Sequence, residues 1–212
     1  GLLVGLRAKG AQPSEVAGGV RALRNAMVPV ASSDPSRLVD TAGTGGGTVT
    51  TFNISTAAAL VAAGTGVLIA KHGNRSFTPR SGSADVLEAL GVAIDLTPER
   101  MGGILAEVGI VFMFAPLLHP AMRHVGPVRR GLGITTVMNI LGPLTNPAGA
   151  QRQVIGVADP ELIDLVAGSL QELGHIRALV VHGEPGMDEI SPSGVTSVAQ
   201  LTESGVTRFE IT

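Results

Sequence analysis

The sequence contains no cysteine, tryptophan or tyrosine, and only five of its 212 residues are phenylalanine. The absence of cysteine excludes disulfide bonds and thiolate metal sites. The scarcity of aromatic residues removes the stacking surfaces on which single-stranded nucleic acids bind. Because 44% of the residues are hydrophobic, the chain can still bury a sizeable core, and that core must be aliphatic.

The chain also lacks an excess of charge of one sign. Its formal net charge is −2, and lysine occurs only twice, at Lys9 and Lys71. We therefore expect no nucleic-acid partner. No apolar run is long enough to span a bilayer and no signal peptide is visible, so we expect no membrane association and a cytoplasmic location. Because the chain starts without methionine inside a helical pattern and ends inside a strand-like run, we expect a truncated chain, part of a longer protein.

From residue 37 onward, segments with strand and helix patterns alternate. The predicted strands cover residues 37–40, 67–70, 109–114, 134–138, 153–157, 178–182 and 196–201. The predicted helices cover residues 54–64, 83–91, 97–107, 119–131 and 160–173. This alternation predicts an α/β fold with a mostly parallel central sheet flanked by helices. Ligands of such sheets bind at the carboxyl ends of the strands.

The N-terminal part of the chain has a different pattern. Residues 1–28 show the apolar spacing of two helices, and residues 29–36 form a polar linker with proline and serine. We therefore predict a small helical segment over residues 1–31 and an α/β domain over residues 36–212.

A glycine-rich turn over residues 43–47 follows the first predicted strand and precedes a helix that opens near Asn53. Glycines let backbone N–H groups approach a phosphate, and a helix N-terminus adds unpaired donors and positive partial charge. A dinucleotide-binding loop would need a third glycine where Thr48 stands and an acid at the end of the next strand, where Lys71 stands. A Walker motif is absent. The pattern indicates a phosphate loop of another kind.

Polar side chains continue beyond this turn. Asn53, Ser55 and Thr56 exceed what helix capping requires, although one of them serves as the N-cap. The run Lys71-His-Gly-Asn-Arg75 follows the second strand and combines two cations, an imidazole and an amide. We expect a binding loop there, with the alternative that Arg75 pairs with an acid such as Asp85 and only shapes the loop.

Asp188 and Glu189 form the only adjacent acidic pair, and they follow the predicted strand 178–182. Carboxylates at a strand end suit Mg²⁺, which prefers oxygen ligands and leaves positions open for phosphates. Surface charge is the alternative for an isolated pair. Arg129 closes a predicted helix, where arginine often only complements the helix dipole. His119, Arg123 and His124 are interpreted as structural.

Together these motifs resemble the anthranilate phosphoribosyltransferase family over about residues 1–205. The resemblance rests on GTGG at 43–46, TFNIST at 51–56, KHGNR at 71–75, GSADVLEALG at 82–91, FAPLLHPAMRHV at 114–125, NILGPLTNP at 139–147 and HGEPGMDEISP at 182–192. It implies a small helical domain, here incomplete, made of residues 1–31 joined in space by about 117–133. It also implies a fold similar to pyrimidine nucleoside phosphorylases and a homodimeric parent enzyme.

The resemblance further implies transfer of phosphoribose from phosphoribosyl pyrophosphate to anthranilate, with Mg²⁺ as the cofactor. By motif, the residues implied to bind the donor are Gly43, Thr44, Gly45, Gly46, Asn53, Ser55, Thr56 and Lys71. The residues implied to line the anthranilate site are Gly43, His72, Asn74, Arg129 and Gly142. Lys71 and Arg129 carry the implied catalytic roles, and Ser55, Asp188 and Glu189 are the implied Mg²⁺ ligands.

Two departures from the family pattern concern the donor. Gly47 and Thr48 replace an aspartate and a glycine of the usual loop, and Thr78-Pro79 replaces paired serines, so that one backbone N–H is lost. Three alternatives stay open: a pyrimidine nucleoside phosphorylase, a non-catalytic relative that binds nucleic acid, and a fragment that folds without turnover. TFNIST and GPLTNP count against the first, and the net charge and intact acidic pair count against the second.

Overall fold

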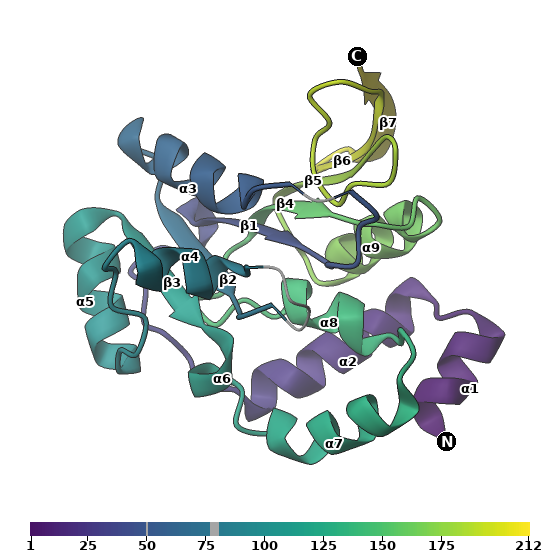
Figure 1. The fold of residues 1–212 in the computed structure, drawn as a ribbon, viewed down its shortest axis with the longest axis horizontal. Coiled ribbons are helices and arrows are strands. Elements are labelled where there is room, and N and C mark those ends of the chain that lie inside the picture. The colour runs from purple at the N-terminus through teal and green to yellow at the C-terminus, as the bar shows by residue number, and fades with distance from the viewer. Residues whose placement is uncertain (50, 77–80) are drawn as a thin grey trace.

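The computed structural model describes residues 1–49, 51–76 and 81–212 (Figure 1). Within these ranges a seven-stranded sheet has the order β3-β2-β1-β4-β5-β6-β7. The strands are β1 (Val39–Gly43), β2 (Ile69–Gly73), β3 (Ile110–Phe114), β4 (Arg152–Gly156), β5 (Arg177–Gly183), β6 (Thr196–Thr202) and β7 (Gly205–Ile211). Neighbouring strands from β3 to β5 are parallel, whereas β6 and β7 add antiparallel pairs at one edge. The predicted mostly parallel sheet is confirmed.

The described residues form nine α-helices, and some of these begin or end at local sequence signals. They are α1 (Leu2–Lys9), α2 (Pro13–Ala26), α3 (Ile54–Gly64), α4 (Ser83–Ala89), α5 (Pro98–Val108), α6 (Ala115–Leu118), α7 (Met122–Leu132), α8 (Met138–Leu144) and α9 (Leu162–Glu172), with a short 3-10 helix at Pro35–Arg37. In α5, for example, the Thr97 hydroxyl accepts from the Arg100 N–H at 3.3 Å, and Gly109 ends the helix at φ 82°.

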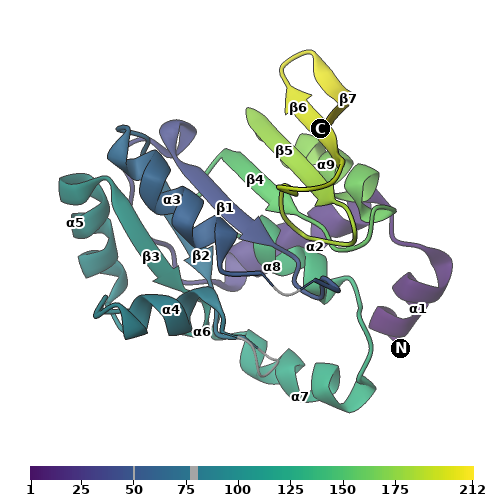
Figure 2. The ribbon, with the colours of Figure 1, turned by 45° about the horizontal axis from the view of Figure 1, so that its top comes forward.

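Helices cover the two faces of the sheet differently. Figure 2 shows α3 lying across β1 and β2 on one face, while α9 lies behind β5 on the other. The larger core cluster is aliphatic and joins α2, α8 and α9 to strands β4, β5 and β6. Its members include Val20, Leu144, Ile155, Val166 and Ala199. A second cluster packs α5 against the other half of the sheet. The scarcity of aromatic residues is thus met by interlocking aliphatic side chains.

The predicted strand at 134–138 is wrong, and the segment that follows it is mostly helix. Residues 133–137 form no strand, and α8 begins at Met138. Met138, Leu141 and Leu144 are buried in the larger cluster at helical spacing. The β-branched run before them favours a strand locally, but packing against α2 and the sheet selects a helix.

The N-terminal helices share the larger core cluster with the sheet. Val16 and Val20 of α2 are fully buried in it, and Met122 and Val125 of α7 pack against it. The division into a helical domain and an α/β domain stays a prediction. Across the described ranges, no helix combines the length and the apolarity needed to cross a bilayer.

Candidate functional site

The glycine-rich turn leaves the end of β1 and lies against the acidic pair. Gly45 and Gly46 have φ values of 72° and 87°, in the left-handed region that favours glycine. A Cβ atom at Gly43 would overlap the Asp188 carboxylate, and one at Gly156 would overlap the Asp188 backbone. Glycine is therefore required here for close approach of two chain segments as well as for the turn.

The two carboxylates of the acidic pair occupy hydrogen-bond donors of the turn and of α3. Asp188 Oδ2 accepts from the Gly45 N–H at 2.9 Å, and Glu189 Oε1 accepts from the Ser55 N–H at 3.2 Å. The Ser55 donor belongs to the first turn of α3, where the helix dipole favours anions. The carboxylates thus stand where the oxygens of an anionic ligand are expected.

Lys71 extends from β2 into the same region. Its side chain is buried, and Nζ donates to the Thr41 carbonyl at 2.5 Å and to Ser55 Oγ at 3.2 Å. Burial lowers the pKa of Lys71, while the charges of Asp40 and Glu189 act in the opposite direction. The Lys71 ammonium therefore lies next to the acidic pair and the N-terminus of α3.

The surroundings of the Glu189 carboxyl group disfavour its negative charge. Burial, followed by repulsion from the Asp188 charge, raises its pKa to about 7, while Ser55 and Lys71 act in the opposite direction. A divalent cation would relieve that repulsion, so the oxygens of Ser55, Asp188 and Glu189 fit the chemistry of Mg²⁺. The described residues hold no group of three or more histidine, cysteine, aspartate and glutamate side chains suited to a metal. Other ligands would have to be hydroxyl, water or phosphate oxygens.

The remaining polar residues of the α3 turn have distinct surroundings. Asn53 is the N-cap residue by position, but its side chain makes no capping bond; its Nδ2 instead donates to the Ser81 carbonyl at 3.1 Å. Thr56 is buried. Thr44 continues the glycine turn, and its N–H donates to the Gly156 carbonyl at 2.9 Å.

A second group of residues surrounds the His72 ring. Its Nε2 lies 3.1 Å from Nε2 of His119, and the nearby Gly142 backbone acts to raise its pKa. Burial, followed by the neighbouring His119 and Lys71, lowers the pKa of His72 to about 3. Two of the residues implied to line the anthranilate site, His72 and Gly142, are therefore neighbours. His119, which is interpreted as structural from the sequence alone, also contacts His72. Its position shortly after the end of β3 is the sequence feature that places it near this edge of the sheet.

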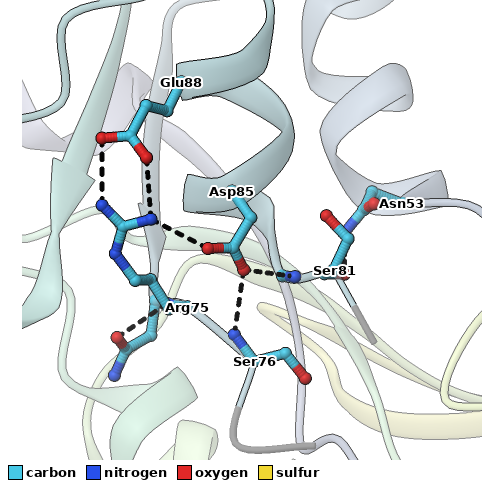
Figure 3. A network of polar contacts seen from close by, with 8 residues as sticks. Asn53, Arg75, Ser76, Ser81, Asp85 and Glu88 are labelled. Atoms are coloured by element: carbon cyan, nitrogen blue, oxygen red, sulfur yellow. Dashed lines mark hydrogen bonds and ion pairs between the residues drawn. The ribbon is translucent and has the colours of Figure 1, made fainter. Parts of the chain in front are cut away.

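Arg75 takes the structural role that the sequence left open. Its guanidinium bonds Asp85 at 2.9 Å and Glu88 at 2.9 and 3.0 Å (Figure 3). Asp85 also accepts from the N–H groups of Gly82 and Ser76. Arg75 thus ties the loop after β2 to the start of α4.

Some predicted residues lie apart from these groups or outside the described residues. Asn74 Oδ1 accepts from the Arg75 N–H at 2.7 Å. Arg129 lies on α7, where burial lowers its pKa, and no hydrogen bond or ion pair joins its side chain to another described residue. Thr78-Pro79 lies outside the described residues. A Cβ atom at Gly47 would lie 3.1 Å from the Gly186 carbonyl and 3.2 Å from Asp188 Oδ1, so a larger side chain there would crowd the acidic pair.

Comparison with known sequences agrees with this geometry. A family profile described as the glycosyl transferase family, a/b domain, matches residues 35–212. The chain is 54% identical over 210 residues to the anthranilate phosphoribosyltransferase of Methanosarcina acetivorans, covering 99% of this chain and 56% of that protein. It is 49% identical over 208 residues to the protein of the same name from Aquifex aeolicus, covering 98% of this chain and 61% of that protein.

The solved structures that resemble this chain carry the same name as its sequence relatives. Anthranilate phosphoribosyltransferase from Thermus thermophilus matches with a TM-score of 0.92 and 50% identity, covering 98% of this chain and 62% of that chain. The Saccharomyces cerevisiae protein in complex with PRPP and Mg matches with a TM-score of 0.88 and 32% identity, covering 99% and 58%. The chain therefore spans 56–62% of the length of these relatives. With its profile match and these identities, the chain belongs to the glycosyl transferase family that the a/b-domain profile defines.

Proposed function

We propose that the whole protein transfers phosphoribose from phosphoribosyl pyrophosphate to anthranilate, giving N-(5-phosphoribosyl)anthranilate and pyrophosphate in tryptophan biosynthesis. One observation carries the proposal: the Gly45 N–H, the Ser55 N–H and Lys71 Nζ meet around the Asp188–Glu189 pair. The relatives named anthranilate phosphoribosyltransferase support it, as do the yeast structures with PRPP and Mg and with 4-fluoroanthranilate.

The donor end of the site is suited to a departing pyrophosphate. As the bond between ribose C1 and pyrophosphate breaks, negative charge grows on the leaving group. Backbone N–H groups of the glycine turn and of the first turn of α3, together with the Lys71 ammonium, would stabilise that charge once the donor has replaced the carboxylates on the Gly45 and Ser55 N–H groups. Gly43, Thr44, Gly46, Asn53 and Thr56 complete the proposed donor wall.

Mg²⁺ would be held by Ser55, Asp188 and Glu189 together with donor oxygens. When bound, it would supply neutralising charge to the pyrophosphate. The raised pKa of Glu189 is consistent with this assignment, because burial and then the Asp188 charge disfavour its ionised form in the absence of a cation. Asp188 and Glu189 now accept the hydrogen bonds of the Gly45 and Ser55 N–H groups. Phosphoribosyl pyrophosphate oxygens would replace the carboxylates as acceptors of these bonds when the substrate binds.

The proposed anthranilate site is formed by the group of residues around the His72 ring. His72 and Gly142 would line the anthranilate route together with Asn74, and Arg129 would face the anthranilate carboxylate. An aromatic amine is already a competent nucleophile, so its nitrogen needs positioning more than deprotonation. Holding it in line with the ribose can contribute on the order of 7 kcal/mol to lowering the barrier. We further propose that the whole protein is a homodimer located in the cytoplasm.

The test follows anthranilate fluorescence in a mixture of this chain, phosphoribosyl pyrophosphate and Mg²⁺, beside a control with EDTA. Mg²⁺-dependent loss of fluorescence is the expected result. If fluorescence stays constant while calorimetry records Mg²⁺-dependent binding of phosphoribosyl pyrophosphate, the donor site stands and the deficit lies on the acceptor side. Absence of donor binding at millimolar concentration would overturn the proposal.

A further inference from the structure

Strands β1 and β2 part from each other just before the site. β1 is paired with β4 at five positions, from Val39↔Arg152 to Gly43↔Gly156, and β2 is paired with β3 over its whole length. Between β1 and β2 the register contains a single pair, Val39↔Ile69. The backbone ladder between β1 and β2 therefore stops after one pair, although both strands are well paired on their other edges.

The backbone groups of the missing rungs have side-chain partners. In a continued parallel ladder, the Thr41 N–H would donate to the Ala70 carbonyl and the His72 N–H to the Thr41 carbonyl. Instead, the Ala70 carbonyl accepts from Asn146 Nδ2 at 2.8 Å, and the Thr41 carbonyl accepts from Lys71 Nζ at 2.5 Å. The His72 N–H donates to Asp40 Oδ1 at 3.1 Å. Side-chain hydrogen bonds thus take the place of the backbone hydrogen bonds that a continued ladder would form at these three groups.

Asp40 and Asn146 form the centre of this replacement. Both are fully buried, and Asn146 Nδ2 donates to Asp40 Oδ2 at 2.8 Å. Asn146 Oδ1 accepts from the Ala148 N–H at 2.9 Å, which fixes the loop after α8. Burial raises the pKa of Asp40, while Lys71, Asn146 and the backbone N–H groups of His72 and Thr41 act in the opposite direction. A buried carboxylate is costly unless it is bonded in this way, so the set acts as one unit.

The interrupted ladder between β1 and β2 affects the position of Lys71, because it leaves the Thr41 carbonyl without a backbone donor from β2. If the ladder closed, the Thr41 carbonyl would also accept from the His72 N–H, and the approach of Lys71 Nζ to that carbonyl would have to change. In the structure, Lys71 Nζ contacts both the Thr41 carbonyl and Ser55 Oγ. The backbone direction at His72 is likewise set by the Asp40 carboxylate.

We propose that Asp40 and Asn146 are positioning residues that hold β1 and β2 apart and thereby place Lys71 and His72 for their substrates. Neither Asp40 nor Asn146 contacts a substrate; both act through the positions of Lys71 and His72. The roles of Lys71 and His72 toward substrates rest on the proposed function, whereas the positioning itself does not.

The first variant is Asp40→Asn, which keeps the size of the side chain. In one amide orientation its NH₂ faces Asn146 Nδ2, and in the other it faces the His72 N–H, so one pair of donors is opposed in either case. The matched control is Ser169→Ala. Ser169 is equally buried, but its hydroxyl bonds the Leu165 carbonyl inside α9, away from the opening.

The position of Lys71 can be read without any ligand. Because Lys9 and Lys71 are the only lysines, lysine labelled with ¹³C at Cε gives two NMR signals. We expect Asp40→Asn to move the Lys71 signal and to speed exchange of the His72 amide hydrogen by about tenfold or more, the effect of one lost bond to a charged group. Ser169→Ala should change neither. If Asp40→Asn does not fold, Asn146→Ala takes its place, since it leaves the carboxylate in the chain.

Donor binding completes the test. Calorimetry with phosphoribosyl pyrophosphate and Mg²⁺ should show a Kd raised by about tenfold or more for Asp40→Asn and unchanged for Ser169→Ala. A folded Asp40→Asn or Asn146→Ala variant with an unmoved Lys71 signal and unchanged His72 exchange would overturn the inference, whatever its donor affinity. If the unaltered chain binds no donor while the Lys71 signal still responds to Asp40→Asn, the proposed function fails and the positioning stands.

Discussion

Lys71 Nζ lies 3.2 Å from Ser55 Oγ, and this contact joins β2 to the first turn of α3. The ammonium is thereby held beside a helix N-terminus whose Ser55 N–H already donates to Glu189. Positive charge from a side chain and from a helix dipole converges on one point, which is the arrangement that an anionic donor requires.

Replacing Lys71 by methionine should weaken donor binding more than acceptor binding. The variant keeps the aliphatic stem and removes the charge, so we expect the Kd of phosphoribosyl pyrophosphate to rise by about tenfold to a hundredfold. The control is Lys9→Met, since Lys9 only forms an exposed ion pair with Glu15. Calorimetry with each substrate measures the effect. An equal loss for both substrates would show that Lys71 supports the fold instead.

Removing the acidic pair should abolish the effect of Mg²⁺. In the double variant Asp188→Asn, Glu189→Gln, the oxygens that accept from Gly45 and Ser55 are kept but the charges are lost. We expect Mg²⁺ to enhance donor binding in the unaltered chain by about tenfold or more and not to affect the variant. We also expect the variant to melt at a higher temperature than the unaltered chain in EDTA, because repulsion inside the pair is relieved. A donor affinity that still rises with Mg²⁺ would remove the pair from the metal site.

Adding a methyl group at Gly43 should disturb the site from the backbone side. A Cβ atom there would overlap the Asp188 carboxylate, so Gly43→Ala should displace it and raise the donor Kd. The control is Gly64→Ala at the end of α3, where a Cβ atom meets nothing within 4 Å. That change should be neutral or stabilise the fold by up to about 1 kcal/mol. Equal effects of the two alanines on donor binding would contradict the close approach.

Acid should destabilise the fold through His175, which lies outside the site. Burial lowers its pKa to about 4, and the charge of Arg24 contributes. The unfolded chain therefore binds this proton more tightly. Stability is complete above the ordinary pKa of about 6.5 and falls as the pH drops toward 4, by about 3 kcal/mol in total.

Denaturant unfolding between pH 7 and 4 measures this effect. His175→Leu should flatten the pH dependence by about that amount, whereas His124→Leu, at an exposed position, should leave it as it is. Unfolding profiles of His175→Leu and the unaltered chain that run parallel across the whole range would show that the acid sensitivity arises elsewhere.

Most of the architecture could be predicted because its signals are local. Helix α3 was predicted at its observed bounds, since an apolar run follows polar residues and a glycine turn. The sequence also pointed to the donor side of the candidate site, because a glycine turn, a lone lysine and an acidic pair all follow strands. The ends of parallel strands meet at one edge, so three distant motifs could be assigned to one place.

Other features depend on neighbours far away in the chain. Residues 134–138 favour a strand by propensity, but the space between α2 and the sheet accommodates a helix beginning at Met138. The contact between His72 and His119 depends on how the segment after β3 folds back over the end of β2. The position of His119 after the end of β3 is a local signal, but it does not show whether the ring contacts His72 or only fills space.

The sequence by itself determined the alternation of strands and helices, the aliphatic core and the chemistry available at the strand ends. These follow from periodicity and side-chain type, which act over a few residues. The tertiary structure alone decided that β1 and β2 part after one pair, and that Asp40 and Asn146, 106 positions apart, fill the opening. Register and buried polar networks are fixed by the packing of distant segments, because most buried donors and acceptors find their partners there.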